Sequence, residues 1–491
     1  ATLIFGAVYA YHLNLSLKRT GEAPVHWSWL PVLGNAIDMG SRPLEFLSEC
    51  AAEHEDIFGM VVAGNRMFII SDVFSSNLIL KPPKSFSWEE FHDLVLSNFF
   101  GAQWGSSGHH GVNSFDEQLM RNWYSNDSAL GKLTIRMQAQ LARDTDRLTA
   151  AGTAAVPFYD LLSRLIFQAS VAALLTPEAA DDPALFEAFK VFDQHLPLAA
   201  GGFKVSYAQA PREARELLYR AVRKYESADN CDFIKKRFEY FDSFGNPHNT
   251  VAFQLAMVWA SVGNTMPSVF WLVFFLMRNP AAMQAVLEEI QSIRPAADSS
   301  GGSSGGCSAD FTQEELNRMT YMDACITETL RLCSGSLIMR HVKEPCEVTL
   351  ASGKSYRFRQ GDRVGLCPPL WHRDAELYPQ PSAFNPARWL PAEATTPEEL
   401  AVASQGKVQL YKAGKPLPLG AGYMPFGGGV TFCPGRRFAR NEVKTLVAVL
   451  LVNFRFEFAG SDAQPDFDGA RAGLGIFPPK TDVLVRVTRK A

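Results

Sequence analysis

The sequence has no excess of charge of either sign and no grouping of its cysteines. Its 491 residues carry 47 Lys and Arg against 51 Asp and Glu, a formal net charge of −4, which gives no reason to expect nucleic-acid binding. The eight cysteines are Cys50, Cys231, Cys307, Cys325, Cys333, Cys346, Cys367 and Cys433. They form no CxxC motif and no Cys/His cluster, so the pattern argues against a zinc site. It is typical of a reducing, cytosol-facing compartment.

The N-terminus has only a short hydrophobic run, Ala1 to Ala10, followed by Lys18 and Arg19. About 20 apolar residues are needed to span a bilayer. The run is therefore the tail of a truncated anchor, a remnant of a transit peptide, or a helix packed on the body. We favour membrane association. We divide the chain into an apolar segment at 1–20, a proline-rich linker at 21–43 and a main domain at 44–491.

The main domain is expected to be mainly helical, with small sheets. Two apolar runs from Ile57 to Ile70 flank a turn at Ala63 to Arg66 and predict a hairpin. Helical patterns dominate 129–279, and Thr312-x-x-Glu315 has the form of a capping box. The Gly/Ser stretch 299–306 predicts a flexible surface linker, and 483–487 predicts a final strand.

The most informative segment is Phe426-Gly427-Gly428-Gly429-Val430-Thr431-Phe432-Cys433-Pro434-Gly435, which leads into an apolar helical stretch. A thiolate ligand needs backbone N–H groups aimed at its sulfur, and glycines allow the backbone to come that close. A helix that starts just after the cysteine directs its positive dipole end to the sulfur. Taken alone, the segment is also compatible with a buried cysteine in a glycine turn.

Two further motifs, together with this loop, resemble those of the cytochrome P450 family. Phe426-x-x-Gly429-x-x-x-Cys433-x-Gly435 resembles its heme-binding loop, Glu328-x-x-Arg331 its helical ion pair, and Phe384-x-Pro386-x-Arg388-Trp389 the segment between them. The resemblance covers nearly the whole chain and implies a single-domain P450 fold. In that fold, heme lies between a long distal helix and the helix after the cysteine loop. It also implies that Glu328, Arg331 and Arg388 form a structural network.

The resemblance implies a heme b cofactor with Cys433 as the axial thiolate and Phe426, Gly427 and Gly435 in the surrounding loop. Thiolate ligation pushes electron density onto iron and favours O–O cleavage. The heme propionates need cationic partners. Arg340 stands where the family often supplies one, and Arg136 is a second candidate.

The distal helix of the family usually carries an acid followed by Thr, which deliver protons to dioxygen. Here the pair is Asn264 and Thr265, with Pro267 close by. An amide donates hydrogen bonds but does not relay a proton as a carboxylic acid does. Pro267 predicts a kink. A plain reading, in which Asn264 caps a break in a core helix, stays open. We predict that Asn264 and Thr265 face the reacting oxygen.

Within the family, this Asn-Thr-Met-Pro segment resembles sterol 7α-hydroxylase, sterol 12α-hydroxylase and prostacyclin synthase. The resemblance places substrate contacts in the lid region, after the Glu328 helix and in the C-terminal turn. The candidates are Phe91, Leu94, Phe100, Leu337, Ile338 and Phe477. Apolar side chains at all six predict a lipid-shaped pocket. The loop from Leu196 to Phe203 is expected at an access channel or a membrane surface.

Two reactions fit these residues. Asn264 favours rearrangement of a fatty-acid hydroperoxide or endoperoxide, an isomerase reaction that needs no dioxygen, NADPH or reductase. The alternative is an O2- and NADPH-dependent monooxygenase that hydroxylates a sterol or another lipid. It would use a P450 reductase docked near the basic residues Arg436, Arg437, Arg440 and Lys444. A non-catalytic heme sensor is disfavoured by Thr265. The expected location is the cytosolic face of the endoplasmic reticulum, with a plastid or another organelle as the alternative.

Overall fold

The computed structural model describes residues 9–10, 12–54, 56–103, 118–120, 122–123, 126–150, 154–227, 229–294, 310–393 and 396–490. The Gly/Ser stretch 299–306, Cys307 and most of the apolar run at 1–10 lie outside these residues.

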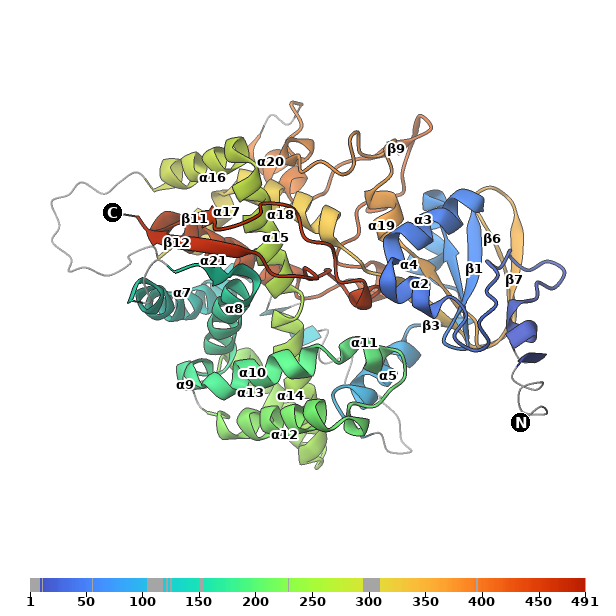
Figure 1. Cartoon of the computed structure of the whole chain (residues 1–491), viewed down its shortest axis with the longest axis horizontal. Coiled ribbons are helices and arrows are strands. Elements are labelled where there is room, and N and C mark those ends of the chain that lie inside the picture. Colours follow the sequence, from blue (N-terminus) through green and yellow to red (C-terminus); the bar gives the residue numbers. More distant parts are fainter. Residues whose placement is uncertain are drawn as a thin grey trace.

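Two regions are visible in Figure 1: a large helical part, and a smaller part built around a sheet near the N-terminus. The helices of eight or more residues are α3 (Pro43–Glu53), α5 (Glu89–Asn98), α7 (Asp127–Ala150), α8 (Phe158–Leu174), α10 (Pro183–Asp193), α12 (Gln209–Lys224), α13 (Asp232–Asp242), α14 (Pro247–Val262), α15 (Thr265–Arg278), α16 (Pro280–Ile293), α18 (Thr320–Cys333), α20 (Pro397–Ser404) and α21 (Arg436–Asn453). Of these, α7, α8, α15, α18 and α21 pack against one another around the main apolar core.

The largest sheet has five strands in the order β1-β2-β8-β5-β3. These are β1 (Ile57–Val62), β2 (Asn65–Ile70), β8 (Arg363–Leu366), β5 (Ile338–Val342) and β3 (Phe86–Ser87). The predicted hairpin is confirmed, with Val62 opposite Asn65 and a two-residue turn. Both turn residues, Ala63 and Gly64, have positive φ values of 47° and 77°, as a hairpin turn matched to strand twist requires.

The predicted C-terminal strand is β12 (Leu484–Arg489), which pairs with β11 (Phe454–Phe458) and β4 (Val156–Pro157). Two further pairs of strands form small hairpins: β6 (Cys346–Thr349) with β7 (Ser355–Phe358), and β9 (Tyr411–Lys412) with β10 (Lys415–Pro416). Short helices complete the connections: α2 (Ala36–Ser41), α4 (Asn77–Leu80), α9 (Pro177–Asp181), α11 (Leu196–Ala200), α17 (Gln313–Arg318) and α19 (Pro368–His372). The capping box is confirmed at Thr312 and Glu315, at the start of α17.

The proline-rich segment 21–43 is attached to the sheet over part of its length. Val25 forms a bridge with Gly59 of β1, and the His26 N–H donates to the Gly59 carbonyl at 2.7 Å. Asn35 then donates its backbone N–H to Val61 at 2.6 Å, just before α2 begins. These bonds pair backbone groups at the edge of β1 that would otherwise be open. The segment therefore covers this edge strand on its way to α2.

The helix that runs through the middle of Figure 1 is broken between α14 and α15. Pro267 has no N–H to donate to the carbonyl of Gly263 four residues earlier, which leaves that carbonyl without its helical partner. Arg471 donates to it instead, with Nη2 at 3.2 Å. The predicted kink is therefore a two-residue turn at Gly263 and Asn264, whose dihedral angles stay in the right-handed helical region. In the described part of the chain, 247–278 is one helical stretch long and apolar enough to cross a membrane, but 83% of its most apolar window is buried inside the protein.

The four basic residues after the cysteine loop do not form one surface patch. Lys444 is buried and donates to Asp323 at 2.7 Å, and Arg440 donates to the same carboxylate at 3.1 Å. They point inward because residues four apart share one helix face, and on α21 this face packs against α18. The expectation of a four-residue docking surface is therefore wrong: only Arg437 of the four is exposed.

Replacing Asp323 by Asn should lower the free energy of unfolding by about 3 kcal/mol or more, because two cations would be left in the interior without a counter-charge. Urea unfolding followed by circular dichroism measures the change. The control is Asp127→Asn, whose partner Arg437 lies at 2.6 Å with side chains 55% and 42% exposed. It should cost less than about 1 kcal/mol. Equal losses in both variants would contradict the assignment.

Candidate active site

A cavity of about 1560 Å³ opens between the helical part and the sheet. It is larger than the 300–1,000 Å³ typical of a pocket for one small ligand. Its walls come from segments far apart in the sequence: α5, the break between α14 and α15, β5, the cysteine loop and the C-terminal turn. The cavity therefore has room for a large cofactor together with a second molecule.

Cys433 lies in the wall of this cavity, at the end of the glycine-rich loop. Its backbone N–H donates to the Phe426 carbonyl at 3.0 Å, which closes the loop, and α21 begins three residues later. Burial raises the pKa of the Cys433 thiol, while backbone N–H groups of Gly435 and Arg436 and the Arg436 charge lower it. Those N–H groups are the donors that a thiolate ligand requires, and a bound metal removes the remaining proton.

Glycine is required at position 429 of this loop. Its φ is +61°, and a Cβ there would lie 2.1 Å from the carbonyl oxygen of Leu80. The loop thus packs backbone to backbone against α4, and a side chain would push it away. Phe426, Gly427 and Gly435 also line the cavity, where the sequence places them.

Arg340 is a buried cation for which the described residues provide no carboxylate. It lies on β5 with 2% of its surface exposed, and burial lowers its pKa to about 10. One terminal nitrogen donates to Met339 at 2.8 Å and the other to Thr431 Oγ1 at 3.2 Å, while Nε has no partner. Such a group is costly unless an anion pairs with it. The carboxylates of a heme in the cavity fit this requirement.

The predicted network around Glu328 is present, with Glu328 and Arg331 completely buried and Arg388 partly exposed. Arg331 donates to both carboxylate oxygens at 2.9 and 2.8 Å, and Arg388 donates to Oε1 at 3.1 Å. Two further donors from the Phe384–Trp389 segment complete it: Trp389 Nε1 donates at 3.0 Å and the Asn385 N–H at 3.0 Å.

His372 connects this network to the cysteine loop. Its carbonyl accepts from Arg331 at 2.5 Å, and its Nε2 accepts from the backbone N–H of Met424 at 3.0 Å. Burial and the charges of Arg331 and Arg373 hold its pKa well below the usual range. The ring is therefore neutral and accepts at Nε2, as the bond to Met424 requires.

Asn264 and Thr265 both line the cavity, at the break in the distal helix. The Asn264 Oδ1 accepts from the Ile476 N–H at 3.0 Å, which fixes the amide and turns its NH2 group away from that bond. Gly475 permits this approach, because a Cβ there would lie 2.0 Å from Oδ1. Thr265 donates to the Ser261 carbonyl at 2.8 Å, so its oxygen keeps lone pairs for another donor.

Glu442 is a site residue that the sequence reasoning missed. It lies on α21, is completely buried and lines the same cavity. Ser170 donates to its Oε1 at 2.7 Å, while Oε2 has no hydrogen bond to the described residues. Burial raises its pKa well above the ordinary value, partly offset by Ser170 and by the Thr265 hydroxyl, which interacts with the carboxyl. An acid within the apolar pattern 438–452 was the available signal.

Two predicted residues lie elsewhere. Arg136 is not part of the cavity wall: it donates to the carbonyls of Ala172, Leu175 and Asp229, so it fastens loop and helix ends. Phe477 is core, 1% exposed and stacked on Phe467 with ring centroids 5.4 Å apart. Its predecessor Ile476 faces the cavity instead, because neighbouring residues of an extended segment point to opposite sides.

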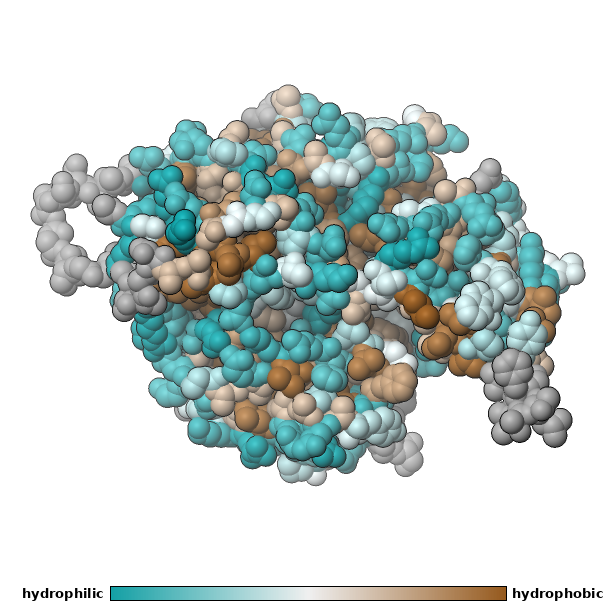
Figure 2. All heavy atoms as spheres, viewed as in Figure 1, coloured by the Kyte–Doolittle hydropathy of each residue, from teal (hydrophilic) through white to brown (hydrophobic). Residues whose placement is uncertain are grey.

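The other predicted substrate contacts line the cavity: Phe91, Leu94, Phe100, Leu337 and Ile338. So do Pro197, Leu198, Ala200, Gly201 and Gly202, from α11 and the turn after it. Figure 2 shows apolar residues on both sides of the recess between these lower helices and the sheet-containing part. The predicted channel rim is therefore part of the cavity wall.

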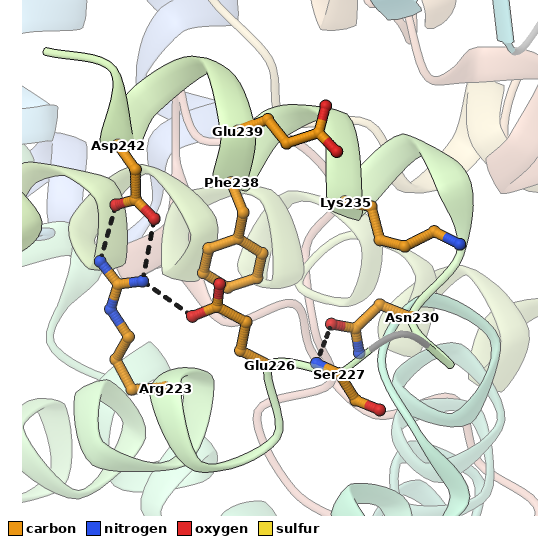
Figure 3. Close-up of a pocket in the computed structure, with 8 residues that line it drawn as sticks. All are labelled: Arg223, Glu226, Ser227, Asn230, Lys235, Phe238, Glu239 and Asp242. Atoms are coloured by element: carbon orange, nitrogen blue, oxygen red, sulfur yellow. Dashed lines mark hydrogen bonds and ion pairs between the residues drawn. The ribbon is translucent and has the colours of Figure 1, made fainter.

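A second hollow, of about 490 Å³, lies between α12 and α13 (Figure 3). Its central Arg223 bonds to Asp242 at 2.8 and 3.2 Å and to Glu226 at 2.8 Å. Because these charges pair with one another, the hollow offers no convergent group for a reaction.

The residues of the large cavity fit a heme: the Cys433 sulfur would bind its iron and Arg340 would pair with its carboxylates, which is the donor set of a heme-thiolate protein. The sequence model of the family "Cytochrome P450" matches residues 223–485. The chain belongs to the cytochrome P450 family. It is an enzyme with a heme cofactor and a cysteine thiolate as axial ligand, and it acts on a lipid.

Similar proteins align along almost the whole chain. Cholesterol 7-alpha-monooxygenase of Cricetulus griseus is 30% identical over 95% of this chain and 93% of its own length. The 5-beta-cholestane-3-alpha,7-alpha-diol 12-alpha-hydroxylase of Sus scrofa is 30% identical, over 96% and 94%. Prostacyclin synthase of Homo sapiens is 27% identical, over 96% and 94%. The predicted group within the family is thereby confirmed.

Replacing Arg340 by Met should accelerate heme loss by roughly tenfold or more, since a charge-assisted hydrogen bond contributes about 1.5–3 kcal/mol. Transfer of heme to an excess of apomyoglobin measures the rate. In the control Arg136→Met, the heme of the folded protein should leave at the wild-type rate. A wild-type rate in Arg340→Met would show that this side chain does not hold the cofactor.

Proposed function

We propose that the protein is a monooxygenase that uses dioxygen and electrons from a reductase to hydroxylate a sterol or a lipid of similar size. The observation that carries the proposal is a fully buried carboxyl, Glu442, in the same cavity wall as Thr265, whose hydroxyl lowers the pKa of that carboxyl. Asn264 alone favours peroxide rearrangement because it removes the usual acid. The Glu442 carboxyl, which comes from another helix, favours monooxygenation instead, because it supplies an ionisable group to the cavity wall that Thr265 also lines.

Glu442 is suited to hold a proton inside the protein. Burial raises its pKa well above the ordinary value, which favours the protonated carboxyl, and Oε2 has no other partner among the described residues and can donate. Thr265 Oγ1 can accept this proton while donating its own. A buried acid–hydroxyl pair can thus move a proton at the cavity wall, which monooxygenation requires and peroxide rearrangement does not. Heme supplies the oxidative chemistry when bound.

The relatives support the same reaction. Two of the three named above are a monooxygenase and a hydroxylase of sterol compounds. The volume of about 1560 Å³ and the apolar lining leave space for a substrate of sterol size beside the cofactor.

Peroxide rearrangement remains the second candidate, and the Asn264 amide favours it. Because Oδ1 is held by Ile476 at 3.0 Å, the NH2 group is the end available to a ligand. A fixed donor of this kind orients a peroxide without transferring a proton. Prostacyclin synthase is among the similar proteins.

We also place the mouth of the cavity on a membrane surface, at the endoplasmic reticulum by analogy with the relatives. Trp27, Trp29 and Ile37 are 59%, 69% and 58% exposed, and Leu198 and Phe203 are 56% and 63% exposed. Leu198 lines the cavity, Ile37 and Phe203 are adjacent to lining residues, and Trp27 and Trp29 lie in the segment that leads into α2. Apolar and tryptophan side chains at such a surface enter the lipid boundary, so a lipid substrate can reach the cavity without crossing water.

The deciding experiment compares two assays of the purified heme-loaded protein. In one, sterols are incubated with NADPH and a P450 reductase. In the other, the ferric protein is mixed with a polyunsaturated fatty-acid hydroperoxide alone. We expect a hydroxylated sterol in the first assay, and slow, mixed decay of the hydroperoxide in the second. Rapid conversion of the hydroperoxide to one product would overturn the proposal in favour of the second candidate.

Replacing Glu442 by Gln should lower product formation by roughly 10²-fold, the scale of a lost proton donor, with more NADPH consumed per product. Stability should not fall at pH 7. The folded pKa lies above the unfolded one, so folding binds a proton at Glu442 between the two values, and this costs free energy as pH rises above about 4.3. Gln at position 442 removes that cost, so the variant should be at least as stable as wild type at pH 7. The difference in the free energy of unfolding should vanish in acid.

Urea unfolding at several pH values and coupled turnover measure the two effects separately. Ser170→Ala is the control, because it removes the other bond to the carboxyl and leaves Thr265 in place. Parallel losses of turnover and stability in Glu442→Gln would mean that this residue is only structural.

The double variant Trp27→Glu/Trp29→Glu should reduce co-sedimentation with phospholipid vesicles several-fold, because charges replace two anchoring rings. Leu419→Glu is the control: Leu419 is 94% exposed but lies outside the cavity mouth, and its binding should not change. Equal vesicle binding by all three proteins would refute this orientation.

A further inference from the structure

Two imidazoles and a carboxylate converge on the outside of the sheet-containing part, away from the heme cavity. His26 Nδ1 lies 3.1 Å from Glu53 Oε2, and His54 Nε2 lies 3.9 Å from Glu53 Oε1. All three ligand atoms lie within 4.8 Å of one another. Among the described residues this is the one group of three or more His, Cys, Asp or Glu side chains with such spacing.

The two segments that carry these residues are held by the same strand. The His26 backbone N–H donates to Gly59 of β1 at 2.7 Å, and its ring packs edge-on against Phe46 of α3, with ring centroids 5.5 Å apart. Glu53 is the last residue of α3, which packs on β1, and His54 is its C-cap. Neither imidazole is on a free loop, so the group is positioned by the fold.

An ion pair alone leaves this group incompletely satisfied. His54 Nε2 is buried as an atom and has no hydrogen bond to the described residues. Pairing both rings with Glu53 as cations would place two positive imidazoles around one carboxylate. A metal ion uses neutral imidazoles and the carboxylate together and satisfies all three.

We propose that His26, Glu53 and His54 bind a divalent zinc ion, with a water in the fourth position. Two imidazoles and one carboxylate are donors that suit zinc. Zinc bonds of 2.0–2.2 Å in a tetrahedron place neighbouring ligand atoms about 3.3 Å apart. His26 Nδ1 lies 3.1 Å from Glu53 Oε2, and the three ligand atoms lie within 4.8 Å of one another. Small side-chain rotations complete the site.

A zinc ion here would link His26, in the proline-rich segment 21–43, to Glu53 and His54 at the end of α3. Between the two lies α2, and its residues Met39 and Gly40 line the heme cavity. The ion therefore braces the part of the cavity mouth that α2 forms, and it stabilises the folded protein through binding to that state alone.

The test is equilibrium dialysis of the heme-loaded protein, stripped beforehand with a chelator, against low micromolar zinc, followed by metal analysis. Wild type should retain one more zinc ion per chain than Glu53→Gln, His26→Ala or His54→Ala. The matched control is His341→Ala, because His341 also pairs with a glutamate, Glu90, but is not part of a three-ligand group. It should retain zinc as wild type does.

X-ray absorption at the zinc edge should show imidazole ligands in wild type, and zinc should raise the thermal midpoint of wild type but not of His54→Ala. An unchanged heme spectrum shows that each variant is folded. No zinc on wild type, or the same amount on wild type and the three variants, would overturn the site and leave an exposed ion pair.

Discussion

The buried carboxylate of Glu328 is the interaction on which the cofactor loop depends. It has no exposed surface and accepts five hydrogen bonds, from Arg331, Arg388, Trp389 and the backbone of Asn385. Such a group is favourable only when all its oxygens are satisfied. Because Arg331 also holds the carbonyl of His372, and His372 accepts from Met424, the network reaches the loop that ends in Cys433. The position of the thiolate is thus set from α18.

Segments whose chemistry lies within a few consecutive residues could be predicted from the sequence. The cysteine loop and the Glu328 helix were predictable because their chemistry requires fixed residue types at short, fixed spacing. Arg340 was predicted from the resemblance, and the described residues provide no carboxylate for its buried charge, which supports that prediction in physical terms. In each case the signal lay within one segment or in a known distance between two segments.

The failures share another cause. Glu442 was missed because its partner Thr265 is 177 positions away in the chain numbering. Arg136 was chosen by its place on a helix, but which carbonyls surround it depends on how α7 meets other segments. Phe477 was chosen in place of its neighbour Ile476. In an extended segment, neighbouring side chains point to opposite sides, so Phe477 lies in the core and Ile476 lines the cavity. Lys444 was predicted to lie on the surface because a lysine is usually exposed. It is buried because Asp323, distant in the sequence, pairs with it.

The interrupted distal helix also sets an order of events during synthesis. The carbonyl freed at Gly263 is bonded by Arg471, 208 residues later, and the amide of Asn264 is oriented by Ile476. Until the ribosome has released that segment, this face of the cavity has unsatisfied backbone groups and a freely rotating amide. The chain can close around its cofactor in native geometry only near the end of translation. Chains that still lack this segment therefore lack the contacts that complete the distal face of the cavity.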